Sequence, residues 1–244
     1  MKTIWLYILM LFAIGQLSAQ NLNIPGLEWD DAYSFDKCNS MKVEFFSKNN
    51  ELMQTLVYKT FYTGTDTKTT ETSLVIPKGN FSVFLDAPSK GSDIEVIFDM
   101  AHEATVQIYA SDAPEPMYTA GMFKFPEVDG IKKLELASTD ETKTIAGHLC
   151  KKYTYQMKRI FGSVWITQEV KLPNDYGIFR AAKMTAKHNT LSVEGFVMEM
   201  TSEDATGAKT VMTTVSLGNS EKRSIKLPRD KMGKAINRAS YFSF

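Results

Sequence analysis

The residues KKYTYQMK at positions 151–158 carry the pattern that decides the fold of this chain. Tyr153, Tyr155 and Met157 alternate with lysine, threonine and glutamine, so that every second side chain is apolar. A period of two residues is typical of a strand with one face buried and the other in water. This stretch therefore predicts a β-strand rather than a helix.

The same alternation recurs along most of the chain. In residues 93–100 it predicts that Asp93, Glu95 and Asp99 face water, with Ile97 as the exception on that side. Similar patterns, or runs of aromatic and β-branched residues, occupy 42–46, 54–62, 105–111, 196–201 and 211–217. Clusters of turn-forming residues separate these runs, at 62–66, 77–80, 88–92, 112–116 and 204–207. The chain is therefore expected to form antiparallel hairpins.

Helical patterns are scarce. The best one covers residues 175–188, with apolar side chains near one face and Asn174 as a capping residue. A second short helix is expected over residues 29–35. The predicted fold class is mainly β, with a large curved antiparallel sheet (a half-barrel) wrapped around one or two short helices.

Residues 1–19 have the features of a secretory signal peptide. Lys2 precedes an apolar run from Ile4 to Ile14, and small residues stand before an expected cleavage ahead of Gln20. The apolar run would rise roughly 16 Å as a helix, too little for a membrane span. We expect an exported protein without a transmembrane segment, located in the periplasm or outside the cell. A single antiparallel β domain over 20–232 and a partly disordered tail over 233–244 would follow.

Composition excludes some partners and leaves one question open. The chain has 28 basic and 28 acidic residues, and this balance lacks the basic excess expected for nucleic-acid binding. The two cysteines, Cys38 and Cys150, allow one disulfide in an exported chain. Two separate buried thiols are the alternative.

No arrangement of residues in the sequence predicts catalysis. His102, His148 and His188 are far apart and show no metal-binding spacing, so each is interpreted as a surface or turn residue. There is no glycine-flanked serine elbow and no glycine-rich phosphate loop. We therefore expect no enzyme activity, no cofactor and no metal. A hidden hydrolase would need titratable groups that converge in a pocket.

Several motifs resemble a family of exported bacterial proteins of unknown function, DUF4412. The line from Thr144 to Tyr153, TIAGHLCKKY, resembles the family pattern T-I-x-G-Y-x-C-K-K-Y. The motifs VWIT at 164–167, GFVME at 195–199 and IKLP at 225–228 follow in the same order, and VIFDM at 96–100 precedes them. His148 replaces a common tyrosine, and Val197 a frequent proline. The resemblance implies a half-barrel similar in outline to the periplasmic lipoprotein carriers, with an apolar cavity.

Methionine and aromatic residues on the apolar sides of strands suggest what such a cavity would hold. Methionine is unbranched and polarizable, so walls rich in it adapt to varied apolar guests, although it also fills ordinary cores. We expect a non-enzymatic binding protein that shelters a lipid or a lipidated segment in the concave face of the sheet. Its predicted lining is Tyr153, Tyr155, Trp165, Phe196 and Met198. The alternative is a structural or protein-interaction module of the cell envelope, with an envelope protein as partner and a filled core.

Overall fold

The structure, a computed structural model, describes residues 25–63, 79–86, 93–109, 116–122, 134–169 and 191–236. These residues form fourteen strands and one 3-10 turn, and no α-helix occurs among them. The strands are β1 (Ala32–Phe35), β2 (Lys37–Phe46), β3 (Leu52–Tyr62), β4 (Phe81–Asp86), β5 (Ile94–Asp99), β6 (Ala104–Tyr109), β7 (Met117–Met122), β8 (Ala137–Ile145), β9 (His148–Met157), β10 (Ile160–Thr167), β11 (Phe196–Asp204), β12 (Lys209–Asn219), β13 (Arg223–Lys226) and β14 (Met232–Ile236), with the 3-10 turn η2 at Arg229–Lys231.

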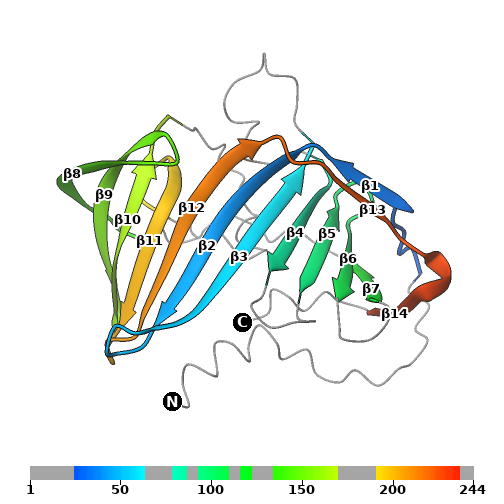
Figure 1. The fold of residues 1–244 in the computed structure, drawn as a ribbon, viewed down its shortest axis with the longest axis horizontal. Coiled ribbons are helices and arrows are strands. Elements are labelled where there is room, and N and C mark those ends of the chain that lie inside the picture. The colour runs from blue at the N-terminus through cyan, green and yellow to red at the C-terminus, as the bar shows by residue number, and fades with distance from the viewer. Residues whose placement is uncertain are drawn as a thin grey trace.

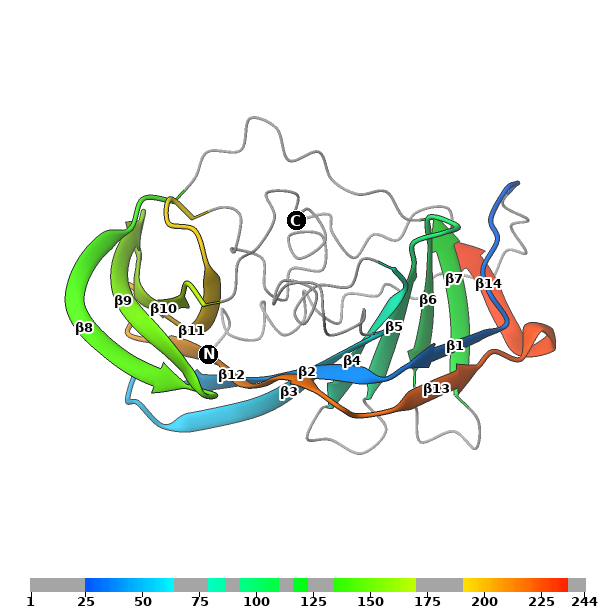
Figure 2. The same cartoon turned by 90° about the horizontal axis from the view of Figure 1, so that it is seen from above.

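Twelve of the strands form one large sheet in the order β14-β7-β6-β5-β4-β3-β2-β12-β11-β10-β9-β8. Every neighbouring pair is antiparallel except β14 and β7, which run parallel. The sheet is strongly curved, and it is not closed into a barrel, because its end strands β8 and β14 do not pair with each other (Figures 1 and 2). The predicted mainly β fold with a large curved antiparallel sheet is confirmed.

Strands β1 and β13 form a separate two-stranded ribbon that covers part of the large sheet. The ribbon continues from β2 and β12 and runs along the outside of the curve (Figure 2). Tyr33 and Phe35 of β1 pack there with Phe61, Ile97 and other buried residues of the sheet. We call the side that the ribbon covers the outer face, and the opposite side the inner face.

The ribbon corrects the prediction of a helix over residues 29–35. Residues 32–35 are strand β1, in which exposed and buried side chains alternate. Tyr33 and Phe35 are two residues apart, so an extended backbone turns both toward the sheet, which a helix would not do. The hydrophobic contact with the sheet thus decides the local structure.

The outer face also corrects the prediction that Glu95 and Asp99 face water. Glu95 is 3% exposed and Asp99 is completely buried. Glu95 accepts a hydrogen bond from Ser82 Oγ at 2.5 Å and forms an ion pair with Arg223 of β13. The two acids alternate with apolar residues as predicted, but the ribbon covers the side on which they lie.

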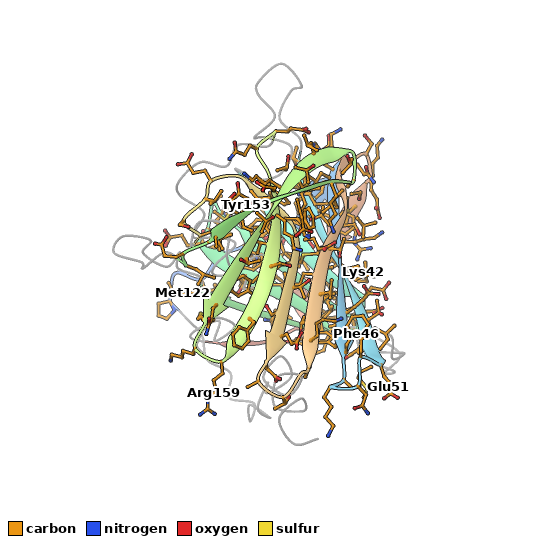
Figure 3. All side chains as sticks on the ribbon, turned by 90° about the vertical axis from the view of Figure 1, so that its left-hand side faces the viewer. Lys42, Phe46, Glu51, Met122, Tyr153 and Arg159 are labelled. Carbon is orange, nitrogen blue, oxygen red and sulfur yellow. The ribbon has the colours of Figure 1, made fainter. Side chains whose placement is uncertain are left out.

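The hairpin connections agree with the turn residues in the sequence. Strands β8 and β9 meet at Ala146 and Gly147, which both have positive φ, as a two-residue hairpin loop requires. Strands β11 and β12 are joined by the predicted turn that contains Gly207. Strands β6 and β7 pair across the predicted connection at 112–116. Viewed from the β8–β11 end, Arg159 and Glu51 mark hairpin turns at the same end of the sheet (Figure 3).

Three predictions concern residues at or beyond the limits of the described part. The expected signal peptide at 1–19 and the expected helix at 175–188 lie outside the described residues. Residues 233–236, which were expected to belong to the tail, instead belong to strand β14 (Met232–Ile236), and residues 237–244 lie outside the described residues. In the described residues no helix is both long and apolar enough to cross a membrane.

Candidate functional site

The predicted lining residues Tyr153 and Tyr155 lie on the inner face, in a buried cluster. They pack with Val164 of β10, Met200 of β11 and Leu191. Leu191 forms an isolated parallel bridge with Leu134, so these two segments lie over this part of the sheet. Both tyrosines are buried core residues at this end of the sheet.

Tyr155 lies across a glycine of the neighbouring strand. Gly162 pairs with Tyr155 in the register of β9 and β10, and a Cβ at this position would overlap the Tyr155 ring and the Thr201 carbonyl. The hydroxyl of Tyr155 donates to the Thr201 carbonyl at 3.1 Å and lies 2.5 Å from Ser202 Oγ. Burial raises the pKa of Tyr155. The tyrosine therefore ties β9 to β11 across β10.

The other three predicted lining residues lie on the opposite face. Trp165 of β10 is paired with Glu199, and the next residue of β10, Ile166, is paired with Val197. Met198 is thus an extra residue in β11, a β-bulge that reverses the alternation beyond it. Trp165, Phe196 and Met198 pack together with Ile145 and Cys150 in a cluster distinct from that of Tyr153. The structure does not bring the five predicted residues to one surface.

Lysine side chains cover Trp165 on the outer face. Lys143 Nζ is 4.3 Å from the centroid of the indole ring, and Lys152 Nζ is 5.7 Å from it. Lys143 also forms an ion pair with Glu199 at 2.8 Å. The two lysines shield the indole from water. The surface over Trp165 is therefore charged, and it is not suited to an apolar ligand.

The centre of the inner face carries apolar residues that the sequence analysis did not single out. Val43, Leu56 and Leu85 are buried there. Half-buried side chains surround them: Met41, Phe45, Tyr58 and Met212. Burial raises the pKa of Tyr58 to about 12, so its phenol stays neutral. Their alternation within strands was readable, but the order of the strands, which puts β12 beside β2, was not.

Aromatic rings continue this inner face onto the next strands. Tyr62, Phe81 and Phe98 are consecutive in the register of β3, β4 and β5. The rings of Phe81 and Phe98 are stacked with centroids 4.4 Å apart and nearly parallel planes. The inner face therefore carries buried and half-buried apolar side chains from β5 across to β10, and its half-buried centre is the candidate binding surface.

The two cysteines are separate buried thiols, which answers the disulfide question left open by the sequence. Cys38 is on β2 and Cys150 is on β9, and both are free. Four strand spacings separate β2 from β9, about 19 Å, whereas bridged Cα atoms are less than about 7 Å apart. Burial and the nearby Glu221 carboxylate raise the pKa of Cys38 to about 12.

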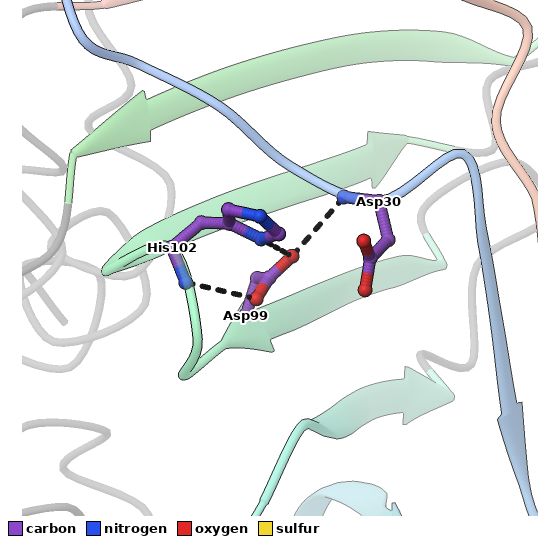
Figure 4. Close-up of side chains that lie close together, drawn as sticks. All are labelled: Asp30, Asp99 and His102. Atoms are coloured by element: carbon purple, nitrogen blue, oxygen red, sulfur yellow. Dashed lines mark hydrogen bonds and ion pairs between the residues drawn. The ribbon is translucent and has the colours of Figure 1, made fainter.

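A second candidate site lies where β1 meets the turn between β5 and β6. Asp30, Asp99 and His102 offer ligand atoms that all lie within 4.8 Å of one another (Figure 4). Asp99 Oδ2 accepts hydrogen bonds from the Tyr33 hydroxyl at 2.7 Å and from the Asp30 backbone N–H at 3.1 Å. His102 Nδ1 is 2.9 Å from the same oxygen. The backbone N–H groups of Ala101 and His102 donate to Oδ1.

These contacts also perturb the pKa values of the cluster. Burial by itself raises the pKa of Asp99, but the hydrogen bonds from Tyr33 and His102 outweigh it and leave this pKa lowered. The hydrogen bond to Asp99 raises the pKa of His102. Burial, and then the Asp99 carboxylate, raise the pKa of Tyr33.

The arrangement supports a structural role for the cluster. These three residues are the ones that could hold a metal ion in the described part, but a metal on Asp99 would displace donors that already occupy both of its oxygens. Asp99 instead closes the β5–β6 turn and holds Asp30 and Tyr33 of the ribbon segment. Of the other histidines, His148 pairs with Glu169 at 2.9 Å, and His188 lies outside the described residues.

Comparison with known proteins adds little to this geometry. No protein-family model and no curated protein matches the chain. Crystal structures of PNGF-II in space groups C2 and P21 are similar over 84% and 83% of this chain. Their identities are 13% and 11%, and their TM-scores 0.36 and 0.35. The chain spans about a third of the PNGF-II chain, 32% and 31%. This likeness carries no functional argument, and the DUF4412 resemblance stays a prediction.

Proposed function

We propose that this chain is an exported, non-enzymatic protein that binds an apolar ligand, a lipid or a lipidated segment, on the inner face of its curved sheet. The observation that carries the proposal is the half-buried apolar surface at the centre of that face. Met41, Phe45, Tyr58 and Met212 are partly exposed around a buried group. Apolar surface of this kind on a concave sheet gains free energy when a ligand covers it, at about 25 cal/mol per Å².

The proposed site differs from the one expected from the sequence. It is centred on β2, β3 and β12, and Tyr153 and Tyr155 form its buried border rather than its open lining. Trp165, Phe196 and Met198 belong to the outer side and are not part of it. Export is supported by the signal-peptide features of residues 1–19. An envelope protein partner remains the alternative occupant of the same surface.

The test is ligand recovery and uptake with a pair of matched variants. Met212 and Val211 are consecutive and both half-buried, but Met212 is paired with Val43 on the inner face and Val211 with Glu44 on the outer face. In purified, delipidated protein, Met212→Ser should weaken uptake of a fluorescent fatty acid several-fold. Val211→Ser should leave uptake within about twofold, although both variants lose similar apolar area.

Two results would overturn the proposal. One is the absence of any apolar molecule in organic extracts of the protein, measured by mass spectrometry, together with no uptake of the fatty acid. The other is an equal loss of uptake in the two variants, which would indicate general destabilisation. Thermal unfolding of both variants provides the stability control.

A further inference from the structure

Gln107 is a buried amide whose nitrogen has no partner. It lies in the middle of β6 and is 2% exposed. In the described part of the chain, its Nε2 is one of two buried side-chain polar atoms without a hydrogen bond, the other being Trp29 Nε1. An unsatisfied buried N–H group is destabilising, and such groups are rare in folded proteins. The structure therefore places a hydrogen-bond donor where a partner is missing.

The location of Gln107 connects this donor to the candidate binding surface. Gln107 is paired with Val96 of β5 and Thr119 of β7. It is two residues from Thr105, which stands in the same register row as Phe81 and Phe98. Its flanking residues Val106 and Ile108 pack under the β1–β13 ribbon, on the outer face. Gln107 therefore belongs to the inner face, as the stacked phenylalanines do.

The other end of the amide is already occupied. The Tyr109 hydroxyl donates to Gln107 Oε1, and Thr119 Oγ1 donates to it at 3.4 Å. Turning the amide over would give Nε2 these neighbours but would leave Oε1 alone. One amide group is thus unpaired in either orientation, and in the orientation that the structure shows, with Oε1 facing the two hydroxyls, that group is the N–H donor.

Charge decides which acceptor suits this donor. The inner-face positions of β4 to β7 that surround Gln107 are apolar or uncharged polar residues. They are Phe81, Val83, Leu85, Ile94, Val96, Phe98, Thr105, Tyr109, Met117 and Thr119. No charged side chain occurs among them, so an ionised carboxylate would be buried there without a counter-charge, at a high cost. A neutral carbonyl oxygen can accept the hydrogen bond without that penalty.

We propose that Gln107 donates a hydrogen bond from Nε2 to a neutral carbonyl oxygen of the bound ligand, such as that of an acyl ester. This inference rests on the proposed function and narrows its ligand class. The acyl chain would cover the inner face toward Phe98 and Phe81, while the ester carbonyl reaches Gln107. The ligand would thus be an uncharged ester rather than a hydrocarbon or an ionised fatty acid.

The first experiment measures displacement of a fluorescent apolar dye by methyl palmitate, heptadecane and palmitate. At a pH of about 8, where palmitate is ionised, the ester should bind more tightly than either other probe in the unmodified protein. In Gln107→Met the affinity for the ester should fall about tenfold, the effect of one hydrogen bond of ~1.4 kcal/mol. The affinity for heptadecane should stay within about twofold. The matched control is Gln156→Met, the same change at an exposed position paired with the outer-face residue Phe161, and it should keep the preference for the ester.

A second measurement uses the unmodified protein, so that it does not depend on the folding of a variant. Methyl palmitate labelled with ¹³C at its carbonyl is bound, and the infrared stretch of that carbonyl is recorded. A shift to lower wavenumber relative to the ester in hydrocarbon solvent is expected from a single N–H donor. A stretch at the hydrocarbon position would overturn the role of Gln107.

The outcomes separate the two proposals. If none of the three probes displaces the dye, the proposed function itself fails. If all three bind equally, or if Gln107→Met weakens ester and hydrocarbon alike, apolar binding stands and the assignment of the carbonyl to Gln107 is wrong. Tighter binding of palmitate than of the ester would likewise contradict the neutral acceptor.

Discussion

The two halves of the large sheet differ in how far their outer faces are covered. Strands β3 to β7 carry the β1–β13 ribbon, so that both Ile97 and Val106 are completely buried beneath it. We call this part the covered half. In strands β8 to β12, the open half, outer-face residues such as Phe161 and Val215 are at least half exposed. One continuous sheet therefore contains a region whose outer face the ribbon covers and a region whose outer face is partly exposed, apart from the buried cluster around Trp165.

Acidic residues on the outer face show the consequence. In the covered half Glu95 and Asp99 are buried, and each is held by several hydrogen bonds or by an ion pair. In the open half Glu141 pairs with Lys152, with the carboxylate side chain 57% exposed. The same pattern of polar and apolar residues thus produces buried, partnered acids in one half and ordinary surface pairs in the other.

The largest expected effect comes from removing a buried ion-pair partner in the covered half. Arg223→Met leaves Glu95 buried without its cation, and we expect a loss of about 3 kcal/mol in the free energy of unfolding, since Arg223 is itself partly exposed. Lys152→Met, the matched change in the open half, should cost less than about 1 kcal/mol. Urea unfolding measures both values. Equal losses would mean that the ribbon does not isolate Glu95 from water.

In the open half, we expect a large loss of stability from a substitution at Gly162, where Tyr155 and the Thr201 carbonyl lie close to the backbone. Gly162→Ala would drive a Cβ into the Thr201 carbonyl and the Tyr155 ring, and we expect a loss of about 2 kcal/mol. Gly79→Ala serves as the control, because a Cβ at that position meets nothing within 4 Å. Its stability should change by no more than about 0.5 kcal/mol. A stable Gly162→Ala protein would contradict the packing of Tyr155 over this glycine.

A smaller effect should depend on pH in the covered half. Asp99 has a lowered pKa, so its contribution is present above the ordinary pKa of about 4 and is lost as the pH falls below it. His102 has a raised pKa, so its contribution is complete below about pH 6.5 and is lost as the pH rises through the higher folded value. The stability difference between the unmodified protein and His102→Gln should therefore shrink from pH 6 to pH 9. A difference that grows over this range would contradict the His102–Asp99 contact.

A reductant should not change the stability of the protein, because both of its cysteines are free thiols. Cys38 in the covered region and Cys150 in the open half are both buried, and burial raises the pKa of each. In the folded protein neither thiol should react with a thiol reagent at pH 8, and in urea both should react. Adding a reductant should leave the unfolding curve unchanged. A shift of that curve would indicate a disulfide.

Sequence periodicity predicted the strands well but could not assign the faces. The alternation in residues 153–157 and 196–200 was read correctly as two strands. The bulge at Met198 then placed Phe196 and Met198 on the outer face, where Trp165 already lies because it alternates with Val164, the partner of Tyr153. A single extra residue changes the face of every residue beyond it, and it appears only when the partner strand is known.

The residues of the candidate binding surface could likewise be assigned to strands from the sequence, but their grouping could not. Gln107 stands among apolar residues of β6, and its sequence neighbours do not reveal that its nitrogen is unpaired. The group of Val43, Leu56, Leu85 and Met212 comes from four strands, two of which, β2 and β12, are far apart in the sequence. Such groups are created by strand order, which local patterns do not contain.

The sequence by itself determined the extended backbone, the hairpin turns and the balance of apolar and polar positions, because these follow from neighbours within a few residues. Only the tertiary structure decided that β1 and β13 fold over the outer face, that Glu95 and Asp99 are therefore buried, and that the two cysteines stay apart. The physical reason is that burial depends on what covers a side chain, and the covering strands come from distant parts of the chain.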